Sequence, residues 1–408
     1  MEKYVKLGDC VELIRDNIDP KFISKVPYIG LEHIEESSLH LNGFGYSTEV
    51  DSTKLKFKKG DILFGKLRPY FRKVIIAPFD GICSTDIWVA RAKQGFDQKY
   101  IFYWMAGKDF VDFSMSGSEG TKMPRAKWEH VVKFERLYLD FSQQKKVGEL
   151  LSTFDDKIEL NRQMNQTLEA MARAIFKSWF VDFDPVYAKM EGRDYPLPPE
   201  IMDLFPYELE ESELGLIPKG WKVVEINSLG EIITGKTPST KNKNYYDKRE
   251  IPFIKIPDMH NKLFITETND YLSKSGADSQ KNKYLPPKSI CVSCIATPGL
   301  TAMTTSFSQT NQQINSIVPH EKELANFILL TMKRKGDEIQ NRGSGGSVLH
   351  NLNKGDFEKL LVILPENKLI GTFENYLNPV FSKILNNQIM NSCLEEIRNR
   401  LLVNLINF

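Results

Sequence analysis

The sequence predicts an α+β fold in which two similar globular domains are joined by two long antiparallel helices. Three observations support this prediction. Much of the chain recurs about 226 residues later, each copy contains short β-rich runs separated by turn residues, and each copy ends in a long heptad pattern. A duplicated unit, made of a globular region followed by a helix, accounts for all three features. We expect a pseudo-twofold relation between the copies.

The repeat is read from residues that recur at a constant offset. Leu151 recurs as Leu377, and the Gly-Ser-x-Gly pattern at 117–120 recurs at 343–346. The match therefore extends from the helices into the globular regions.

The globular regions are expected to combine short strands with helices. Between 59 and 88 the runs DILF, KVIIA and ICSTDIWV alternate with turn residues, and between 288 and 318 the runs SICVSCI, LTAMTTSF and QQINSIV repeat that rhythm. Strands bounded by Gly, Pro, Asp and Asn have this spacing. The segments 100–107 and 322–335 are predicted to be helical.

Two segments carry a heptad seam. Steps of alternately four and three residues run from Val147 to Trp179 and from Phe373 to Leu405, 33 residues in each case. A seam of this length favours a coiled coil over the apolar stripe of an ordinary core helix. A structural brace or a dimerisation arm is the alternative for the helices considered alone.

Each seam contains two asparagines near its centre. If the helices are antiparallel, Asn161 faces Asn391 and Asn165 faces Asn387. A mispaired amide in an apolar layer loses its hydrogen bonds, so buried asparagine fixes the alignment of helices at a cost in stability. We expect these four residues to set the helix–helix register.

Two residues interrupt the second seam. Arg398 would lie opposite Phe154, and we expect its side chain to snorkel toward solvent. Pro379 could begin the helix with Asn378 as its cap, or it could kink a longer helix. Both alternatives for Pro379 remain open at this stage.

The composition limits the class of protein. Of 408 residues, 41% are hydrophobic and 26% are charged, and 54 Lys and Arg balance 53 Asp and Glu. Any basic face for an anionic partner must therefore be local. The five scattered cysteines suit a reducing compartment. The N-terminal segment is charged and the apolar runs are far shorter than the roughly 20 residues of a membrane span, so we expect a cytoplasmic protein without membrane association.

One stretch matches a nucleotide-binding motif. GEIITGKT at 230–237 fits the phosphate-loop pattern G-x-x-x-x-G-K-[ST]. That loop needs a strand before it, small residues within it and a helix after it. Here the interior reads as a strand, and the segment after Thr237 is polar without apolar periodicity. We interpret the match as a coincidence.

No other motif assembles a catalytic or metal site. The single C-x-x-C of Cys291 and Cys294 lies in a strand-like run, where buried cysteines act as small hydrophobes. The six histidines show no metal-ligand spacing. We predict no catalytic residue, no metal and no cofactor. A single-chain DNA-modifying enzyme remains an alternative, because catalytic groups are brought together in space rather than in sequence.

Local charge is more informative. Between 54 and 73, eight Lys and Arg are opposed by one acidic residue, with Tyr70 and Phe71 interleaved. A solvated basic face is one interpretation, and a loop that contacts nucleic acid is the other. The loops at 116–127, 235–243 and 342–350 add cations, hydroxyls and small residues that let a backbone approach phosphate. The residues predicted to contact DNA are Lys66, Arg68, Tyr70, Arg72, Lys73, Lys122, Arg125, Lys236, Thr237, Lys241, Lys243, Arg342, Ser344, Ser347 and His350.

Three segments together resemble the specificity (S) subunit of type I restriction–modification systems. They are FDDKIELNRQMNQTLEAMARAIFKSWFVDFDPV at 154–186, ESELGLIPKGWKVVEI at 211–226 and LGEIITGKTPST at 229–240. The resemblance covers essentially the whole chain. It implies a non-catalytic protein with two target-recognition domains, each reading one half of a bipartite site in double-stranded DNA. It also implies that the helices dock two modification (methyltransferase) subunits, and that restriction subunits supply ATP-dependent translocation and cleavage.

The resemblance also suggests boundaries. They are target-recognition domain 1 at 1–142, a central conserved helix at 143–181, a linker at 182–219, target-recognition domain 2 at 220–365 and a distal conserved helix at 366–408. At 1.5 Å per residue the first seam spans about 50 Å, against about 34–36 Å between half-sites one DNA turn apart. We expect helix length to set the gap between the half-sites. A protein-only coiled-coil adaptor is the alternative, and it predicts no salt-dependent DNA binding.

Overall fold

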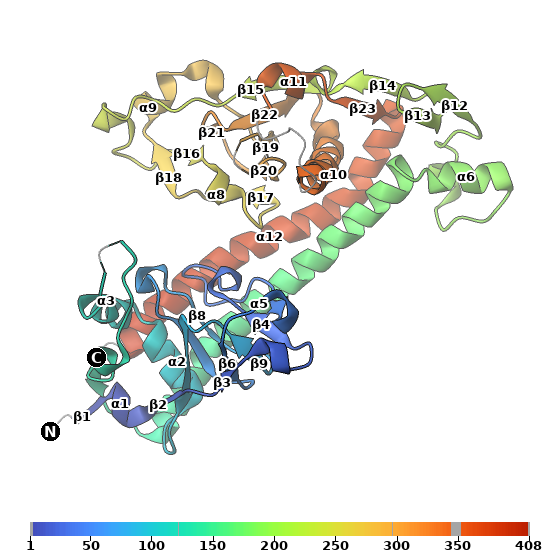
Figure 1. Cartoon of the computed structure of the whole chain (residues 1–408). Helices are drawn as coiled ribbons and strands as arrows, with labels where there is room; N and C mark the ends of the chain where they lie inside the picture. The colour runs from blue at the N-terminus through green and yellow to red at the C-terminus, as the bar shows by residue number, and fades with distance from the viewer. Residues whose placement is uncertain (1–2, 121, 296, 344–351, 407–408) are drawn as a thin grey trace. The chain divides into compact units, whose positions relative to one another are not determined.

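The protein is described here from a computed structural model (Figure 1). The residues that it describes are 3–120, 122–295, 297–343 and 352–406. The chain divides into two compact units, with Met1–Arg162 and Met390–Phe408 in unit 1 and Gln163–Ile389 in unit 2. The division passes through two 40-residue helices, α5 (Phe141–Phe180) and α12 (Asn367–Ile406). Each unit therefore contains a part of both helices.

Unit 1 contains two main sheets. Its strands are β1 (Tyr4–Lys6), β2 (Val11–Ile14), β3 (Asn17–Ile18), β4 (Pro27–Ile29), β5 (Gly45–Tyr46), β6 (Lys54–Phe57), β7 (Ile62–Gly65), β8 (Val74–Ile76), β9 (Gly81–Cys83), β10 (Ile87–Ala92) and β11 (Glu135–Leu137). One sheet has the order β2-β10-β7-β8 and is antiparallel. The other has the order β3-β6-β9-β4-β5, with β4 and β9 parallel, and β1 pairs with β11.

Helices cover one face of the antiparallel sheet of unit 1. They are α1 (Leu7–Cys10), α2 (Gln98–Ala106), α3 (Lys108–Ser116) and α4 (Trp128–Val131). Elsewhere in unit 1 lie the 3₁₀ turns η1 (Pro20–Phe22), η2 (Leu31–His33), η3 (Ser47–Glu49) and η4 (Pro69–Phe71). Side chains alternate along each strand. Ile62 and Phe64 of β7 pack with the helices, whereas Leu63 packs against the second sheet. Unit 1 is thus layered helix–sheet–sheet.

Unit 2 has its own set of elements. Its strands are β12 (Leu209–Ser212), β13 (Gly215–Pro218), β14 (Lys222–Glu225), β15 (Gly230–Thr234), β16 (Ile251–Ile254), β17 (Phe264–Ile265), β18 (Asp270–Leu272), β19 (Ile290–Ser293), β20 (Thr301–Thr304), β21 (Gln309–Thr310), β22 (Ile314–Pro319) and β23 (Leu361–Leu364). Its helices and 3₁₀ turns are α6 (Asp184–Glu191), α7 (Pro199–Met202), α8 (Ile256–Met259), α9 (Lys274–Asp278), α10 (Ala325–Gly343), α11 (Lys354–Glu358), η5 (Ile226–Ser228), η6 (Lys243–Tyr245), η7 (Lys281–Lys283) and η8 (Lys322–Leu324).

The strand order of unit 2 repeats that of unit 1. In the sheet β15-β22-β19-β20-β17, the first four strands take the places of β2-β10-β7-β8. In the sheet β18-β16-β21, the strands match β5-β4-β9, and the pair β16–β21 is parallel like β4–β9. The pair β14–β23 matches β1–β11. The two domains are therefore similar α+β folds, as the sequence repeat predicts.

Backbone hydrogen bonds outside the strands also recur at equivalent positions of the two units. The amide of Lys66 donates to the carbonyl of Asp86 at 2.9 Å, and the amide of Cys294 donates to the carbonyl of Gln313 at 2.8 Å. Lys66 and Cys294 are 228 residues apart, and Asp86 and Gln313 are 227 apart. The duplication thus extends to individual bonds.

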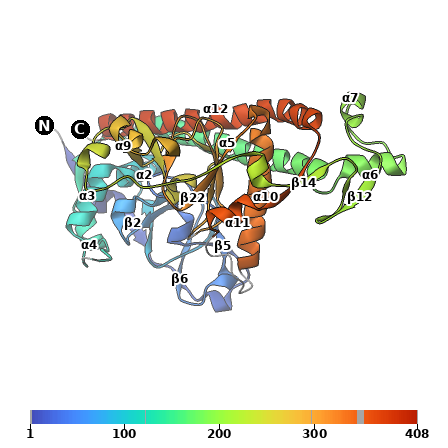
Figure 2. The ribbon, with the colours of Figure 1, turned by 90° about the horizontal axis from the view of Figure 1, so that it is seen from above.

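The helices α5 and α12 pack antiparallel in each unit (Figures 1 and 2). In unit 1, Leu151 lies in one apolar cluster with Leu402. In unit 2, the ring centroids of Phe176 and Phe373 are 6.1 Å apart. The predicted coiled-coil pair is therefore confirmed as two antiparallel helices that each domain packs against.

The central asparagines are hydrogen-bonded in the pairs that an antiparallel arrangement requires, and the pattern is the same in both units. One amide of each pair donates to the other, and the second donates to an isoleucine carbonyl on the facing helix. Their role in fixing the register stays a prediction. The four bonds are Asn161 Nδ2–Asn391 Oδ1 (2.8 Å), Asn391 Nδ2–Ile158 O (3.3 Å), Asn387 Nδ2–Asn165 Oδ1 (2.8 Å) and Asn165 Nδ2–Ile384 O (3.3 Å).

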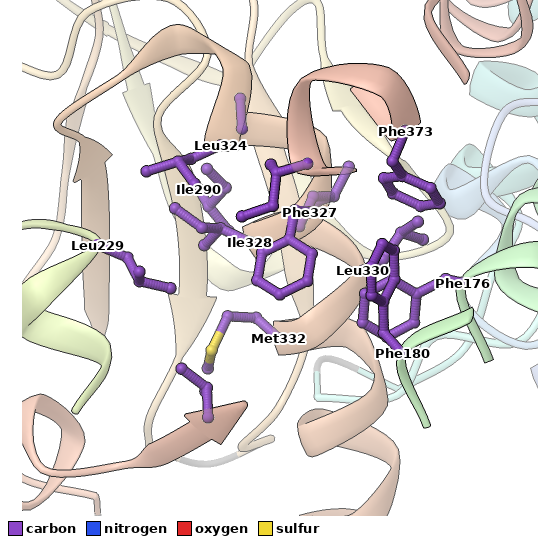
Figure 3. Packing of buried hydrophobic residues seen from close by; sticks show 14 of the residues in the cluster. Phe176, Phe180, Leu229, Ile290, Leu324, Phe327, Ile328, Leu330, Met332 and Phe373 are labelled. Atoms are coloured by element: carbon purple, nitrogen blue, oxygen red, sulfur yellow. The ribbon is translucent and has the colours of Figure 1, made fainter. Parts of the chain in front are cut away.

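An aromatic core fixes the helices to unit 2 (Figure 3). Phe176 and Phe180 of α5 meet Phe327 of α10 and Phe373 of α12 in one buried cluster. The rings of Phe180 and Phe373 are 4.8 Å apart between centroids and nearly perpendicular. Edge-to-face packing of this kind adds about 0.5–1.5 kcal/mol per pair beyond the area that is buried.

The segment at 182–219, expected to be a linker, contains α6, α7 and the β12–β13 hairpin. Phe183, Phe205 and Ile217 from this segment are buried in the cluster that also contains Trp179. The segment is thus partly folded onto unit 2. Sequence reasoning missed this because the segment is rich in Pro and Glu, and its buried apolar residues are widely spaced.

The prediction that Arg398 snorkels to solvent is wrong. Its side chain is 0% exposed and forms an ion pair with Asp155 of α5. Tyr103 of α2 also donates to Asp155. A buried guanidinium is stable only when it is paired and hydrogen-bonded, and Asp155 meets that need. Pro379 lies inside α12, so the alternative in which it begins the helix is also wrong.

His40 lies beside this ion pair. Its side chain is 6% exposed, and Nε2 lies 3.9 Å from Asp155 Oδ1. The pKa of His40 is lowered to about 3, first by burial and then by the cations of Arg162 and Arg398. The imidazole is therefore neutral at physiological pH, and no additional charge enters the cluster.

In the part of the chain that the structure describes, every helix is too short or too polar to cross a membrane.

The paired asparagines should be energetically coupled. Asn391→Leu leaves the buried amide of Asn161 without its acceptor and should lower the free energy of unfolding by about 1–3 kcal/mol. Adding Asn161→Leu removes the stranded group, so the double variant should show a coupling energy of about 0.5–3 kcal/mol in a denaturation double-mutant cycle. Asn404→Leu, at an exposed position of α12, is the control and should change stability by less than about 0.5 kcal/mol. Simple additivity would contradict the pairing.

His40 should make stability depend on pH. Its folded pKa of about 3 lies below the ordinary 6.5, so between these values the unfolded chain binds a proton that the folded chain does not. Stability should therefore fall as the pH drops below about 6.5, with a slope from this residue approaching about 1.4 kcal/mol per pH unit. Thermal unfolding of His40→Gln should lack this component, whereas a variant of the exposed His260 should keep it. Parallel curves for His40→Gln and the wild type would refute the assignment.

Candidate nucleic-acid interface

The two loops of unit 1 that were predicted to contact DNA lie against each other. Leu67 and Arg125 form an antiparallel bridge, and the amide of Arg68 donates to the carbonyl of Pro124 at 2.7 Å. Both loops follow from the fold, because the first connects β7 to β8 and the second precedes α4. Residues some 60 positions apart in sequence therefore form one surface.

The same contact recurs in unit 2. The amide of Ala126 donates to the carbonyl of Lys66 at 2.9 Å, and the amide of Leu352 donates to the carbonyl of Cys294 at 3.1 Å. In unit 1 the loop after β7 is thus bonded to the segment before α4, and in unit 2 the loop after β19 is bonded to the segment before α11.

The turn between Arg68 and Arg72 has an unusual backbone. Both residues have φ of 50°, in the left-handed region that L-residues seldom adopt. Between them lies η4, whose Tyr70 is 49% exposed, with its ring 4.6 Å from that of Phe71. The Nε of Arg68 is buried without a hydrogen-bond partner among the described residues. Strain and an unsatisfied donor are typical of a functional site rather than of a stabilising turn.

A groove of about 420 Å³ lies beside this turn. It is open to solvent and combines cations with the aromatic pair Trp88 and Trp128, whose centroids are 5.2 Å apart. Cations neutralise phosphates, and aromatic faces and edges pack against bases or sugars. Its cationic lining residues are Arg15, Lys66, Arg125 and Lys127.

Two of these cations are held by surface ion pairs. Arg125 Nε lies 3.1 Å from Asp86 Oδ1, and Lys127 pairs with Glu119. Exposed pairs of this kind contribute little to stability. The cations can therefore exchange a carboxylate for a phosphate at small cost. Lys122, in the same loop, is exposed.

Arg72 and Lys73 point into unit 1 instead. Arg72 Nε donates to the carbonyl of Ala106 at 2.5 Å, and burial lowers the pKa of Arg72 to about 10. Lys73 Nζ donates to the carbonyl of Leu31 at 2.8 Å. The sequence predicted both as DNA contacts because a run of cations does not reveal which side chains turn inward.

In unit 2 the predicted loop follows β15. Lys236, Lys241 and Lys243 are exposed, and Thr237 Oγ1 donates to Gln312 Oε1 at 2.7 Å. The strand leads into a loop and the short turn η6 rather than a helix. The resemblance of 230–237 to a phosphate loop therefore lacks the helix N-terminus that would bind phosphate.

The start of this loop is tightly enclosed. A Cβ at Gly235 would lie 2.1 Å from the carbonyl oxygen of Asn311. The amide of Lys236 donates to the carbonyl of Thr310 at 2.9 Å, and Gln280 Nε2 donates to the carbonyl of Lys236 at 2.7 Å. These contacts fix the direction in which the lysines leave the sheet.

Four predicted residues cannot be placed in the same detail. Arg342 belongs to α10, but its side chain is outside the described part of the chain. Ser344, Ser347 and His350 lie outside the described residues.

Sequence reasoning missed other residues of the groove. Arg15, Trp88 and Trp128 come from separate elements, and no local pattern marks them. For the described residues, no group of three His, Cys, Asp or Glu could hold a metal ion. Cys291 and Cys294 are buried in or beside β19, and burial raises the pKa of Cys291 to about 12, which leaves its thiol protonated and unreactive.

Comparison with known proteins agrees with a DNA-reading role. The family model described as "Type I restriction modification DNA specificity domain" matches residues 2–170 and 218–391. The chain belongs to this family. Each match contains one domain and most of the helix that follows it, so the family unit coincides with the sequence repeat. Specificity subunits are the non-catalytic members of type I systems, and DNA recognition is the function of this chain.

Individual specificity subunits are similar over most of their length. The HindI specificity subunit of Haemophilus influenzae is 35% identical over 99% of this chain and 98% of its own. The MjaIX specificity subunit of Methanocaldococcus jannaschii is 26% identical over 77% and 69%. The solved S subunit from M. genitalium shares the fold, with a TM-score of 0.55 at 13% identity over 100% of this chain and 96% of that one.

Gly235 should be essential to the stability of unit 2, because it begins the loop that follows β15. In Gly235→Ala the new Cβ would meet backbone, which cannot move as a side chain does, so we expect a loss of about 1–3 kcal/mol in the free energy of unfolding. Gly371→Ala is the matched control, because its Cβ would meet nothing within 4 Å and alanine is favoured in a helix by about 1 kcal/mol. Chemical denaturation checks both variants. Equal stability of the two would show that the enclosure of Gly235 is unimportant.

Proposed function

We propose that this chain is the DNA-reading subunit of a type I restriction–modification complex, and that each domain reads one half of a bipartite site in double-stranded DNA. The observation that carries the proposal is the duplication. Two domains of the same strand order each place a loop and its partner segment side by side, and each falls in its own family match. A duplicated reader suits a site made of two halves.

The proposed division of the chain follows from this role. Residues 1–142 and 220–365 are the two target-recognition domains, and 143–181 and 366–408 are the conserved helices. Residues 182–219 connect the first helix to the second domain.

Contacts with DNA are proposed to combine phosphate and base recognition. In unit 1, Lys66 and Arg125 at the groove neutralise phosphates, while Arg68 and Tyr70 on the strained turn reach base edges or sugars. In unit 2, the exposed lysines after β15 serve phosphates, and Arg342, Ser344, Ser347 and His350 are proposed as further donors. Phosphate contacts set position and the turn residues set specificity.

The helices are proposed to dock two modification (methyltransferase) subunits. Both helices carry several apolar side chains that are roughly half exposed, and a docked subunit would cover this apolar surface. They include Leu150, Leu160 and Met171 on α5, and Ile397 and Val403 on α12. Restriction subunits would add ATP-dependent translocation and cleavage to the complex. The chain itself supplies neither the methyl donor nor the catalytic residues in this proposal.

A segment exchange tests whether each domain reads its own half-site independently. Residues 54–88 contain the strained turn and, from the groove, Leu55, Lys66, Thr85 and Trp88, so replacing them with the matching segment of another specificity subunit should change one half of the methylated sequence. Replacing 288–318 should change the other half. Mapping methylated adenines in cells that express each chimera gives the result.

The outcome separates the proposal from its alternatives. A change in both halves would contradict independent reading by the domains. A protein-only adaptor predicts no salt-dependent DNA binding by the assembled complex, and a single-chain enzyme predicts methylation or cleavage by the purified chain without any partner.

A further inference from the structure

The strained turn of unit 1 is followed by a residue that points away from the proposed DNA surface. Arg72 itself has the left-handed backbone, and its guanidinium is directed at α2 and α12. Nε donates to the carbonyl of Ala106, at the end of α2, at 2.5 Å, and Nη2 donates to Asn399 Oδ1 of α12 at 3.5 Å. One side chain thus joins the turn to two helices.

The attachment continues into the helix pair. Asn399 Oδ1 accepts a second hydrogen bond from Arg398 Nη2 at 3.3 Å, and Arg398 is ion-paired with Asp155 of α5. Arg398 Nη1 also lies 3.5 Å from the carbonyl of Ser38. A continuous chain of partly buried polar contacts therefore runs from Arg72 through α12 to α5.

The charges around Arg72 are partly balanced. Arg398 repels its guanidinium, whereas Asp155 and Glu395 attract it, and His40 is neutral. Both carboxylates lie on the helices, Asp155 on α5 and Glu395 on α12, and a buried charge that has lost its partners is costly. The side chain is consequently held in one place.

Unit 2 uses different chemistry at the equivalent positions. The counterparts of Arg398 and Asp155 at the offset of 226 are Ala172 and Phe381, which are buried in the apolar cluster. The counterpart of Arg72 is Gly299, since the bond from Gly65 to the carbonyl of residue 73 recurs from Ser293 to the carbonyl of residue 300. The polar attachment is thus a property of unit 1.

We propose that Arg72 is a positioning residue for DNA specificity, which through Ala106, Asn399 and the Arg398–Asp155 pair holds the turn that presents Arg68 and Tyr70. The inference rests on the proposed function of the turn. A left-handed arginine persists only where its surroundings over-determine it, and these contacts provide that constraint. Without them the turn can relax, and the reading residues lose their fixed geometry. Small displacements of this kind weaken specificity more than general affinity.

The test uses the assembled complex with its cognate DNA and with DNA altered in either half-site. Arg72→Gly keeps the left-handed backbone accessible but removes the attachment. Asn399→Ala leaves Arg72 in place and removes the shared acceptor, which keeps the inference testable if Arg72→Gly fails to fold. Arg400→Ala, at an exposed neighbour on α12, is the matched control.

Arg72→Gly should reduce discrimination at one half-site by roughly 10-fold or more, with the other half-site unaffected. Asn399→Ala should shift discrimination at the same half-site in the same direction, and Arg400→Ala should match the wild type. The dependence of log affinity on log salt should not change. A slope reduced by about 1 would mean that Arg72 contacts phosphate directly, and this would overturn the positioning role.

Loss of discrimination at both half-sites would indicate general damage and would also overturn the inference, as would unchanged discrimination in both variants. If the wild-type complex fails to discriminate at either half-site, the proposed function fails first and the inference falls with it. The wild-type measurement therefore separates the two failures.

Discussion

The antiparallel pairing of α5 and α12 is the constraint on which both units depend. Each apolar core includes residues of both helices, so a shift in their alignment would disrupt the seating of each domain. Apolar contacts alone would tolerate a shift of one heptad, because the seam repeats. We predict that the amide layers do not tolerate such a shift. In unit 1, Asn161 bonds to Asn391 and Asn391 to the carbonyl of Ile158, and the same pattern recurs in unit 2.

The two domains are seated on this scaffold by different chemistry. In unit 2, aromatic rings of the helices, such as Phe180 and Phe373, pack with Phe327 of α10 in one apolar cluster. Unit 1 combines apolar contacts with a buried ion pair between Arg398 and Asp155, which fixes orientation but is costly when either partner is lost. The contacts between helices and domain are therefore chemically different in the two units.

The sequence predicts the features that are set by period and repetition. The helices, their antiparallel sense, the facing asparagines and the similarity of the domains all follow from spacing alone. What it could not predict depends on packing. Arg398 was expected at the surface because the heptad pattern does not reveal that Asp155 of the facing helix lies close enough to form an ion pair with it. The direction of Arg72, and the groove that brings Arg15 to Trp128, are likewise decided by segments distant in sequence.

A common backbone with different side chains explains how one scaffold can support two readers. The position after η4 is left-handed in unit 1, with Arg72 at φ 50°, and its counterpart in unit 2 is Gly299 at φ 92°. Glycine adopts this conformation at no steric cost, and its Cα packs closely against Gly336 of α10. Arginine adopts it at a cost of order 1–3 kcal/mol. An arginine at this position is compatible with a stable fold only if its side-chain contacts stabilise the folded state by more than the backbone strain destabilises it. The contacts of Arg72 with α2 and α12 supply that stabilisation.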